Sequence, residues 1–386
     1  MDPKNVLTLK VGGKLYAGWK SVSVRLSIEQ IAGTYELVVT ERWPSQPTRW
    51  SIPPGEVCEI LIGDDTVISG FVDSVAVSYD AASHDIRVTG RDRTGDLVDC
   101  SAPSTAFSGL TFFEIAEKLT DPYGISVVDE TEDGKKLSVK EKKAGKKGTQ
   151  PKHKRVAGKL PKMATQNGES VFKTLEKLAR CEGVLLVSDT EGGLLITRAG
   201  MGGDCDTVLE FGQNILKANF EHSHANLYSD ITVKGQAAAA DAGKFDVVHA
   251  QPVGNVARVN TAKSGNSQID RFRPLIIVAE TQADSKRCQD RAQWEASNRE
   301  AKARKISLTV QGWRQKGGDL WRINQMVKVK CPWMRVDEKW LIAGTAFRLD
   351  DGGTLTELTL VNKDAFDLLP EIPEPQAGLV DAKYKV

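Results

Sequence analysis

Residues 67–90, VISGFVDSVAVSYDAASHDIRVTG, decide the fold class of this chain. The run from Val67 to Tyr79 is rich in valine, residues 80–83 are small or polar, and Asp85 to Gly90 form a second strand-like run. Two such runs separated by a short turn-forming segment are typical of antiparallel strands. This stretch therefore predicts a long strand that ends near Asp80 and a second strand that returns beside it.

The residues before this stretch continue the same pattern. Val6–Val11 and Leu15–Trp19 flank Gly12-Gly13, which is a hairpin signal, and Val57–Ile62 predicts a further strand. The prolines of residues 43–55 lack the N–H group that a central strand needs, so a loop is expected there. Short strands at this spacing predict a small barrel or sandwich over residues 1–103.

Two helix–strand units follow within residues 104–204. Thr111 and Glu114 have the spacing of a helix capping box. The expected apolar face of this helix consists of Phe112, Ile115, Ala116 and Leu119. A similar order of residues recurs 59 positions later, where Gly183 corresponds to Gly124 at the end of a second helix. Two such units predict one small α/β domain.

A basic insertion separates these two units at residues 131–163. From Thr131 to Lys162 the chain has twelve Lys or Arg and three Asp or Glu, whereas the remainder is mildly acidic. Because the segment has few apolar residues to offset the entropy of ordering it, we expect an exposed insertion. It could contact nucleic-acid phosphates, an anionic lipid or, as the favoured interpretation, a partner protein.

Residues 205–369 return to β-structure. A long, strongly charged helix is expected near residues 281–304, and the proline-rich residues 370–386 are expected to form an extended tail. The strand-like runs of this region are Val208–Phe211, Ile215–Gly235, Ile306–Gly312, Gln325–Cys331, Trp340–Leu349 and Thr354–Val361.

An internal repeat links the two ends of the chain. Ile342–Ala346 resembles Ile68–Val72, with Gly344 aligned to Gly70, and in both places a strand runs on to an aspartate and a second strand returns. This similarity suggests two barrels of one design. The expected fold class is β-rich α+β, with two antiparallel β-barrel domains and one small α/β domain.

Sequence motifs for catalysis are absent. The chain has no Gly-x-Ser-x-Gly nucleophile motif and no Gly-rich phosphate loop. Its six cysteines include no Cys-x-x-Cys pair, which argues against a zinc site and a disulfide framework. No run approaches the roughly 18–20 apolar residues of a membrane span, and the N-terminus has no apolar signal region. We therefore expect a protein made in the cytoplasm that does not insert into a membrane.

Three groups of residues have a functional interpretation beside a structural one. His222 and His224 would face one side of a strand, but no third metal ligand is evident near them. Gly90–Asp96 places two Arg and two Asp around a turn, which fits an ion-paired strand exit better than an active site. Tryptophans can form a carbohydrate platform but more often fill a core or a subunit interface, and four lie together at Trp313, Trp321, Trp333 and Trp340. We expect no catalytic, cofactor-binding or metal-binding residues and no enzymatic activity.

Several segments, in consistent order along most of the chain, resemble the Mu-like bacteriophage baseplate hub family. They are Ile68–Val75, Val88–Ser101, Val310–Trp313, Gly318–Asn324 and the hairpin Gly352-Gly353-Thr354. The resemblance implies a structural hub in the tail baseplate of the virion, assembled in the host cytoplasm. It also implies two tube-like barrel domains per chain, similar in architecture to the N-terminal half of type VI secretion spike proteins.

The same resemblance implies the partners. A homotrimer would form a ring of six quasi-equivalent barrels that joins a six-fold tail tube to a three-fold spike and contacts other baseplate proteins. DNA would pass through the lumen without specific binding, and the acidic balance of the chain outside the insertion suggests an acidic lumen.

Two alternatives remain open at this point. The tryptophans could belong to a tail-associated cell-wall-binding or hydrolase component, which predicts peptidoglycan binding or cleavage. The basic insertion could belong to a nucleic-acid-binding protein, which predicts DNA retention at low salt.

Overall fold

The first part of the chain forms antiparallel strands. The computed structural model describes residues 3–40, 52–80, 84–131, 163–236, 254–260, 271–278 and 285–366. The strands before residue 93 are β1 (Leu7–Val11), β2 (Lys14–Tyr16), β3 (Ser21–Ser27), β4 (Thr34–Thr40), β5 (Val57–Ile62), β6 (Asp65–Tyr79) and β7 (His84–Asp92). β6 and β7 pair from Gly70 opposite Asp92 to Tyr79 opposite His84, so the strand pair predicted from residues 67–90 is confirmed.

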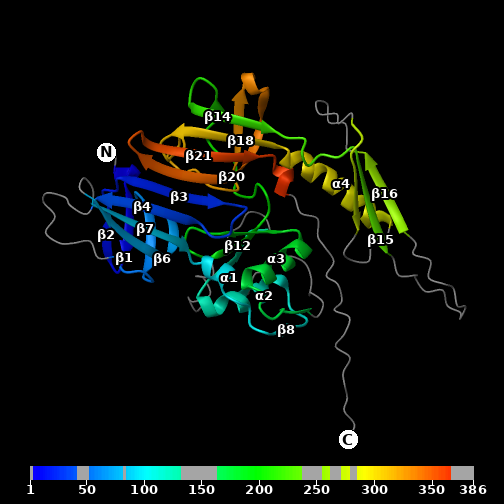
Figure 1. The fold of residues 1–386 in the computed structure, drawn as a ribbon, viewed down its shortest axis with the longest axis horizontal. Coiled ribbons are helices and arrows are strands. Elements are labelled where there is room, and N and C mark those ends of the chain that lie inside the picture. The colour runs from blue at the N-terminus through cyan, green and yellow to red at the C-terminus, as the bar shows by residue number, and fades with distance from the viewer. Residues whose placement is uncertain are drawn as a thin grey trace, which may run out of the picture.

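Two helix–strand units form a compact α/β region beside this sheet (Figure 1). Thr111 accepts a hydrogen bond from the Glu114 N–H and the Glu114 carboxylate accepts one in return, so the predicted capping box is confirmed. Gly124 and Gly183 both adopt the left-handed conformation that follows each helical segment. The elements are α1 (Gly95–Asp99), β8 (Ala106–Phe107), α2 (Phe112–Thr120), β9 (Val127–Asp129), β10 (Met163–Ala164), α3 (Val171–Glu182), β11 (Leu185–Ser188) and β12 (Leu194–Thr197).

The second half of the chain adds its strands to the first sheet. These strands are β13 (Leu209–Glu210), β14 (Ile215–His222), β18 (Arg304–Gln311), β19 (Met326–Cys331), β20 (Val336–Asp350) and β21 (Gly353–Val361). Among the described residues, hydrogen bonds connect 13 strands in the order β14-β18-β21-β20-β3-β4-β7-β6-β5-β1-β2, with β19 on β20 and β13 on β19. The fold is β-rich α+β, as expected, and the strands that the sequence assigns to two β-barrel domains are joined in one hydrogen-bonded sheet because β3 pairs with β20.

A separate unit lies between β14 and β18. Its strands β15 (Asp230–Gln236), β16 (Gly254–Asn260) and β17 (Pro274–Val278) form their own sheet, which packs on α4 (Ser285–Lys302) (Figure 1). Ala292 and Ala296 of α4 are buried against this sheet, as the apolar positions of the predicted helix implied. The sequence predicts a single domain over residues 205–369, and nothing in its pattern distinguishes this smaller sheet and its helix.

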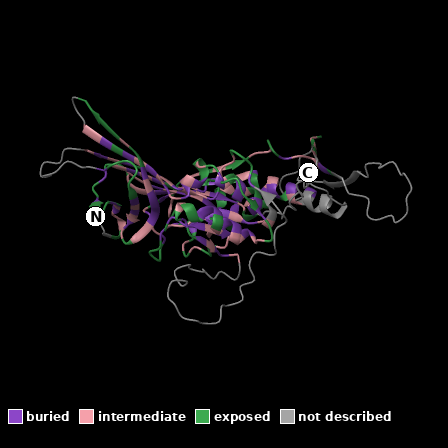
Figure 2. Ribbon diagram, turned by 90° about the horizontal axis from the view of Figure 1, so that it is seen from below, coloured by how far each residue is buried: buried purple, intermediate pink, exposed green. Residues whose placement is uncertain are grey.

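One hydrophobic core joins the two halves of the large sheet (Figure 2). Val22 and Val24 of β3 contribute to the same cluster as Phe347 of β20. Three of the four clustered tryptophans are buried in this core, Trp313, Trp321 and Trp340, and the Trp313 indole N–H donates to the Arg348 carbonyl at 3.0 Å. A carbohydrate platform built from the four is therefore wrong, because only Trp333 is exposed.

Several predictions lie outside the described residues. They concern most of the basic insertion 131–163, most of the proline-rich segment 43–55 and the tail 370–386. In the part of the chain that is described, no helix is long and apolar enough to cross a membrane.

Candidate functional site at the edges of the sheet

One arrangement of five strands occurs twice in the sheet. The order β3-β4-β7-β6-β5 in the first half corresponds to β14-β18-β21-β20-β19 in the second, with antiparallel pairing at each step. The lengths agree as well, because β5 and β19 have 6 residues, β6 and β20 have 15, and β7 and β21 have 9. The internal repeat suggested by the sequence is thus confirmed as a repeat of strand order.

The two arrangements also share a β-bulge. β6 and β7 shift register between Val72 and Ser74, and β20 and β21 shift register between Ile342 and Gly344. Ser74 therefore corresponds to Gly344, and the pairing of β6 with β7 follows the same register as that of β20 with β21.

The alignment of Gly344 with Gly70, taken from the sequence, is wrong by four positions. Gly70 lies where the backbones come close, because a Cβ there would collide with the Arg91 carbonyl oxygen. A Cβ on Gly344 would find its nearest neighbour at 3.5 Å, which is ordinary contact. Close backbone packing excludes a Cβ at Gly70 but not at Gly344, so the two glycines are not at equivalent positions.

The two halves meet beside Met326, the first residue of β19. β19 pairs with β20 only as far as Leu341, and β3 takes over the same edge of β20, from Gly344 opposite Ser27 to Leu349 opposite Val22. Phe347 and its partner Val24 are 1% and 0% exposed at this junction. A strand of one half thus completes the sheet of the other.

The equivalent edges are left open in the described residues. β5 covers β6 only as far as Phe71, so among the described residues the edge from Ser74 to Tyr79 pairs on its β7 side alone. Within the same ranges, β14, the counterpart of β3, pairs only with β18. Val77 and Tyr79 are 61% and 77% exposed on the first edge. Open edges with exposed apolar side chains are templates for pairing with another chain.

A second contact between the halves is made by Arg314, in the loop after β18. Its guanidinium donates to the Asp65 carboxylate at 2.6 Å and to the carbonyl oxygens of Ile62 and Lys4, each at 2.9 Å. Asp65 and Ile62 flank the turn between β5 and β6. The second half therefore holds the β5–β6 turn of the first. Sequence reasoning missed this arginine, because nothing local distinguishes it from a solvated one.

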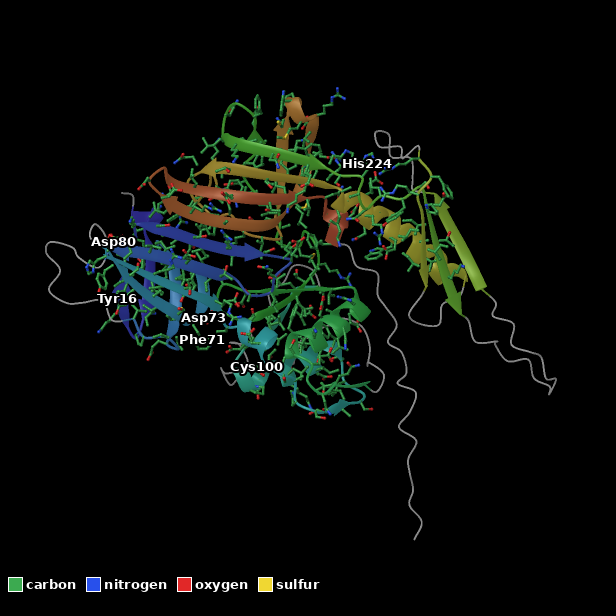
Figure 3. The ribbon with its side chains drawn as sticks, in the orientation of Figure 1. Tyr16, Phe71, Asp73, Asp80, Cys100 and His224 are labelled. Atoms are coloured by element: carbon green, nitrogen blue, oxygen red, sulfur yellow. The ribbon has the colours of Figure 1, made fainter. Side chains whose placement is uncertain are left out.

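The predicted turn at Gly90–Asp96 is an ion-paired strand exit, as favoured. Arg91 donates to Asp73 at 3.0 Å and to Asp99 at 2.6 Å, and these pairs raise the pKa of its guanidinium. Asp73 is the residue skipped at the bulge, and Figure 3 labels both Asp73 and Cys100, the residue that follows α1. The arrangement attaches α1 to the sheet.

Asp92 is a buried residue that joins the first half of the sheet to the α/β region. It is 2% exposed and accepts hydrogen bonds from the Gly33 N–H, the Thr94 N–H and hydroxyl, and the Ser188 hydroxyl at 2.6 Å. Burial raises its pKa, and these donors partly offset that effect. Asp92 thus connects the first half of the sheet to β11 of the α/β region.

His222 and His224 do not form a metal site with other described residues. Their rings meet edge to face with centroids 5.0 Å apart at the end of β14 (Figure 3). Burial and the nearby His224 and Arg304 lower the pKa of His222. No group of three or more His, Cys, Asp or Glu side chains suited to a metal occurs in the described ranges.

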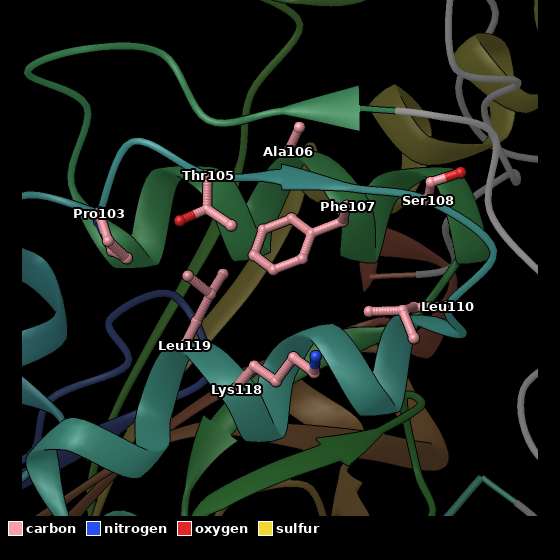
Figure 4. Close-up of a pocket in the computed structure, with 8 residues that line it drawn as sticks. All are labelled: Pro103, Thr105, Ala106, Phe107, Ser108, Leu110, Lys118 and Leu119. Atoms are coloured by element: carbon pink, nitrogen blue, oxygen red, sulfur yellow. The ribbon is translucent and has the colours of Figure 1, made fainter.

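A pocket of about 440 Å³ lies between β8 and α2 (Figure 4). Its lining consists of Pro103, Thr105, Ala106, Phe107, Ser108, Leu110, Lys118 and Leu119. Lys118 is the one charged side chain among the described residues that line the pocket, so these residues supply no paired acid and base for catalysis.

Three family models together match most of the chain. The N-terminal domain of Mu phage baseplate assembly protein GpP-like matches residues 6–92. The second domain of baseplate hub protein gp44-like matches residues 94–150 and 152–198, and the fourth domain of Mu phage baseplate assembly protein GpP matches residues 284–369.

Individual relatives agree with these matches. Baseplate hub protein gp44 of Escherichia phage Mu is 32% identical over 366 residues, which cover 94% of this chain and 89% of that protein. The crystal structure of the 43 kDa tail protein of prophage MuSo2 from Shewanella oneidensis is similar with a TM-score of 0.77 and 32% identity, covering 94% of this chain and 100% of that one.

A more distant structure shares the fold. It is a component of the Escherichia coli type VI secretion system, described as similar to the bacteriophage T4 tail proteins gp27 and gp5, with a TM-score of 0.54 and 9% identity over 95% of this chain and 80% of that one. The type VI resemblance expected from the sequence is therefore confirmed for the fold. The chain belongs to the family of the Mu phage baseplate hub protein gp44, and it is a structural component of the virion tail baseplate rather than an enzyme.

Proposed function

We propose that three copies of this chain form a closed ring at the centre of the baseplate. The two halves of each sheet act as tube-like β-barrel domains, so that six quasi-equivalent domains surround one channel. Such a ring matches a six-fold tail tube on one side and a three-fold spike on the other. Family membership supports the hub role, and the repeated strand arrangement supports the ring geometry.

The observation that carries this proposal is the β3–β20 junction. If β14 meets β6 of the next copy as β3 meets β20 within a copy, the bulges fix the register. Phe220 then lies opposite Val77, as Val24 lies opposite Phe347. Tyr79 lies opposite Ala218 in the same way. A ring of three copies would contain three β3–β20 junctions within chains and three β14–β6 junctions between chains. The edges of β6 and β14 would then all be paired.

The face of the sheet opposite the core would line the channel. Arg87 pairs there with Glu36 at 3.4 Å, and Arg348 pairs with Glu357 at 3.0 Å. These two pairs each place a basic beside an acidic side chain, so they give no support to the acidic lumen expected from the sequence. DNA would pass through this channel without specific binding.

A cross-link tests the ring and its register together. Ser78 and Asn219 are directly opposite in the proposed pairing, and both are exposed. The double variant S78C/N219C should form disulfides between copies on mild oxidation and give covalent dimers and trimers on a non-reducing gel.

Two controls accompany this cross-link. Each single variant should stay monomeric on the gel, and S78C/E221C, displaced by two residues, should cross-link more weakly. A folded double variant that yields no covalent oligomer would contradict the proposed pairing.

A further inference from the structure

The turn between β19 and β20 exposes a large aromatic side chain. Pro332–Met334 form a short 3-10 helix at this turn, and Trp333 is 79% exposed. Phe211 lies at the same end of β19, where its N–H donates to the Lys330 carbonyl at 3.0 Å, and its side chain is 56% exposed. We call Trp333 and Phe211 the turn patch. The β19–β20 hairpin, drawn in orange, projects at the top of Figure 1.

The equivalent turn in the first half is covered. Arg314 of the second half binds Asp65 and the Ile62 carbonyl at the β5–β6 turn. A Cβ added to Gly63 would lie 2.8 Å from the Lys4 carbonyl oxygen and 3.2 Å from the Arg314 guanidinium, so this turn is closely packed. Among the described residues, the β5–β6 turn is therefore covered by protein, whereas the equivalent β19–β20 turn is exposed.

This difference has a direction. Within one chain, the second half contributes β20 to the junction and the first half contributes β3. The second half also binds the β5–β6 turn of the first half, through Arg314. Between copies, the proposed ring pairs β14 from the second half of one copy with β6 from the first half of the next copy. Here β6 takes the place of β20, and β14 takes the place of β3. By the same correspondence, the first half of the next copy lies beside the β19–β20 turn.

We infer that the turn patch is an interface with a second copy of this chain, covered by the first half of the neighbouring copy. The inference rests on the proposed ring and adds an apolar contact to its strand pairing. The contact differs in chemistry from its counterpart. At the β5–β6 turn of the first half, Arg314 binds the Asp65 carboxylate. At the β19–β20 turn of the second half, the exposed Trp333 would pack against an apolar surface of the next copy. A tryptophan at the centre of an interface buries a large area and commonly dominates its binding energy.

The test compares the full-length wild-type protein with Trp333→Glu and a matched variant, Phe272→Glu. Phe272 is 83% exposed outside both arrangements, so it controls for the loss of one exposed aromatic residue. Light scattering over a dilution series measures the concentration at which the trimer dissociates. W333E should raise that concentration by about tenfold or more, and F272E should leave it unchanged. Circular dichroism checks that both variants remain folded.

The outcomes separate this inference from the proposed function. A wild-type protein that is monomeric contradicts the ring itself. A wild-type trimer whose dissociation W333E does not change overturns the turn-patch inference and leaves the ring standing. If W333E keeps the trimer and instead loses binding to purified tail tube or spike protein, the patch serves another baseplate protein and the inference is wrong.

Discussion

Asp73 of β6 and Ala343 of β20 are the two residues skipped at equivalent β-bulges near opposite ends of the chain. Each bulge follows the point where the short neighbouring strand ends, and each redirects the long strand along a new partner. In β20 that partner is β3, whereas in β6 the same edge is open among the described residues. The correspondence of these two residues is the basis for the register proposed between copies.

The open edge of β6 should be the most sensitive part of the assembly. Val77→Lys places a charge opposite Phe220 of the next copy, so we expect the trimer to dissociate to folded single chains. Val57→Lys is the matched control, because Val57 is also exposed but lies on β5, between β1 and β6. Gel filtration with light scattering measures both. Equal masses for the two variants would contradict the assignment of this edge.

Arg314 should stabilise the joined sheet. Arg314→Ala removes the donor to the Asp65 carboxylate and to the carbonyl oxygens of Lys4, Ile62 and Gly318. We therefore expect a loss of about 1–3 kcal/mol in the free energy of unfolding. Arg314→Lys should recover little of this, because an ammonium cannot reproduce the spread of guanidinium donors.

Urea unfolding measures the Arg314 effect, and Arg87→Ala serves as its control. Arg87 forms an exposed pair with Glu36, so its loss should cost less than about 1 kcal/mol. A larger effect for Arg87 than for Arg314 would show that the β5–β6 turn contact contributes little.

Asp92→Asn should destabilise the junction with the α/β region. Both carboxylate oxygens accept hydrogen bonds, so the amide NH₂ would face a donor, at a cost of about 1–3 kcal/mol at neutral pH. Asp99→Asn, at the exposed pair with Arg91, is the control and should cost less.

The pH dependence of this effect has a defined sign. Because burial raises the pKa of Asp92, the folded protein binds its proton more tightly than the unfolded chain. The contribution of Asp92 to stability therefore decreases as the pH rises from the ordinary carboxyl range through the raised pKa. The deficit of D92N should accordingly be larger at low pH than at neutral pH. A deficit that grows as the pH rises would contradict the direction of the pKa shift.

Cys58 should be unreactive in the folded protein. It is 0% exposed, its thiol lies 3.1 Å from the Tyr35 hydroxyl, and burial raises its pKa to about 11. Because the thiolate is the reactive form, labelling with a thiol reagent at pH 8 should modify Cys100 before Cys58. Peptide mass spectrometry identifies the labelled residues, and denaturant should abolish the difference. Faster labelling of Cys58 would mean that the core of the first half opens readily.

Local features of this fold could be predicted because they depend on nearby residues. The capping box at Thr111 and Glu114, the left-handed Gly124 and Gly183, and the strand pair of residues 67–90 all form as expected. Each is encoded by residues a few positions apart, so one segment of sequence is enough to identify it.

Features that join distant segments could not be predicted. The alternation of Val22 and Val24 shows that β3 has a buried face, but it does not show that its partner is β20. The bulge at Ala343 leaves no mark in composition, and so the glycine-based alignment was displaced. Arg314 is an ordinary loop arginine until the β5–β6 turn is placed beside it. One signal was available for the open edge, since apolar residues continue to Tyr79 beyond the reach of β5.

The mass of the wild-type protein in solution tests the central claim most directly. Static light scattering at micromolar concentration should give three times the 42.1 kDa mass of one chain. The same mass should persist in moderate salt, because the proposed junctions are strand pairs and apolar contacts. A folded protein with the mass of a single chain would contradict the ring.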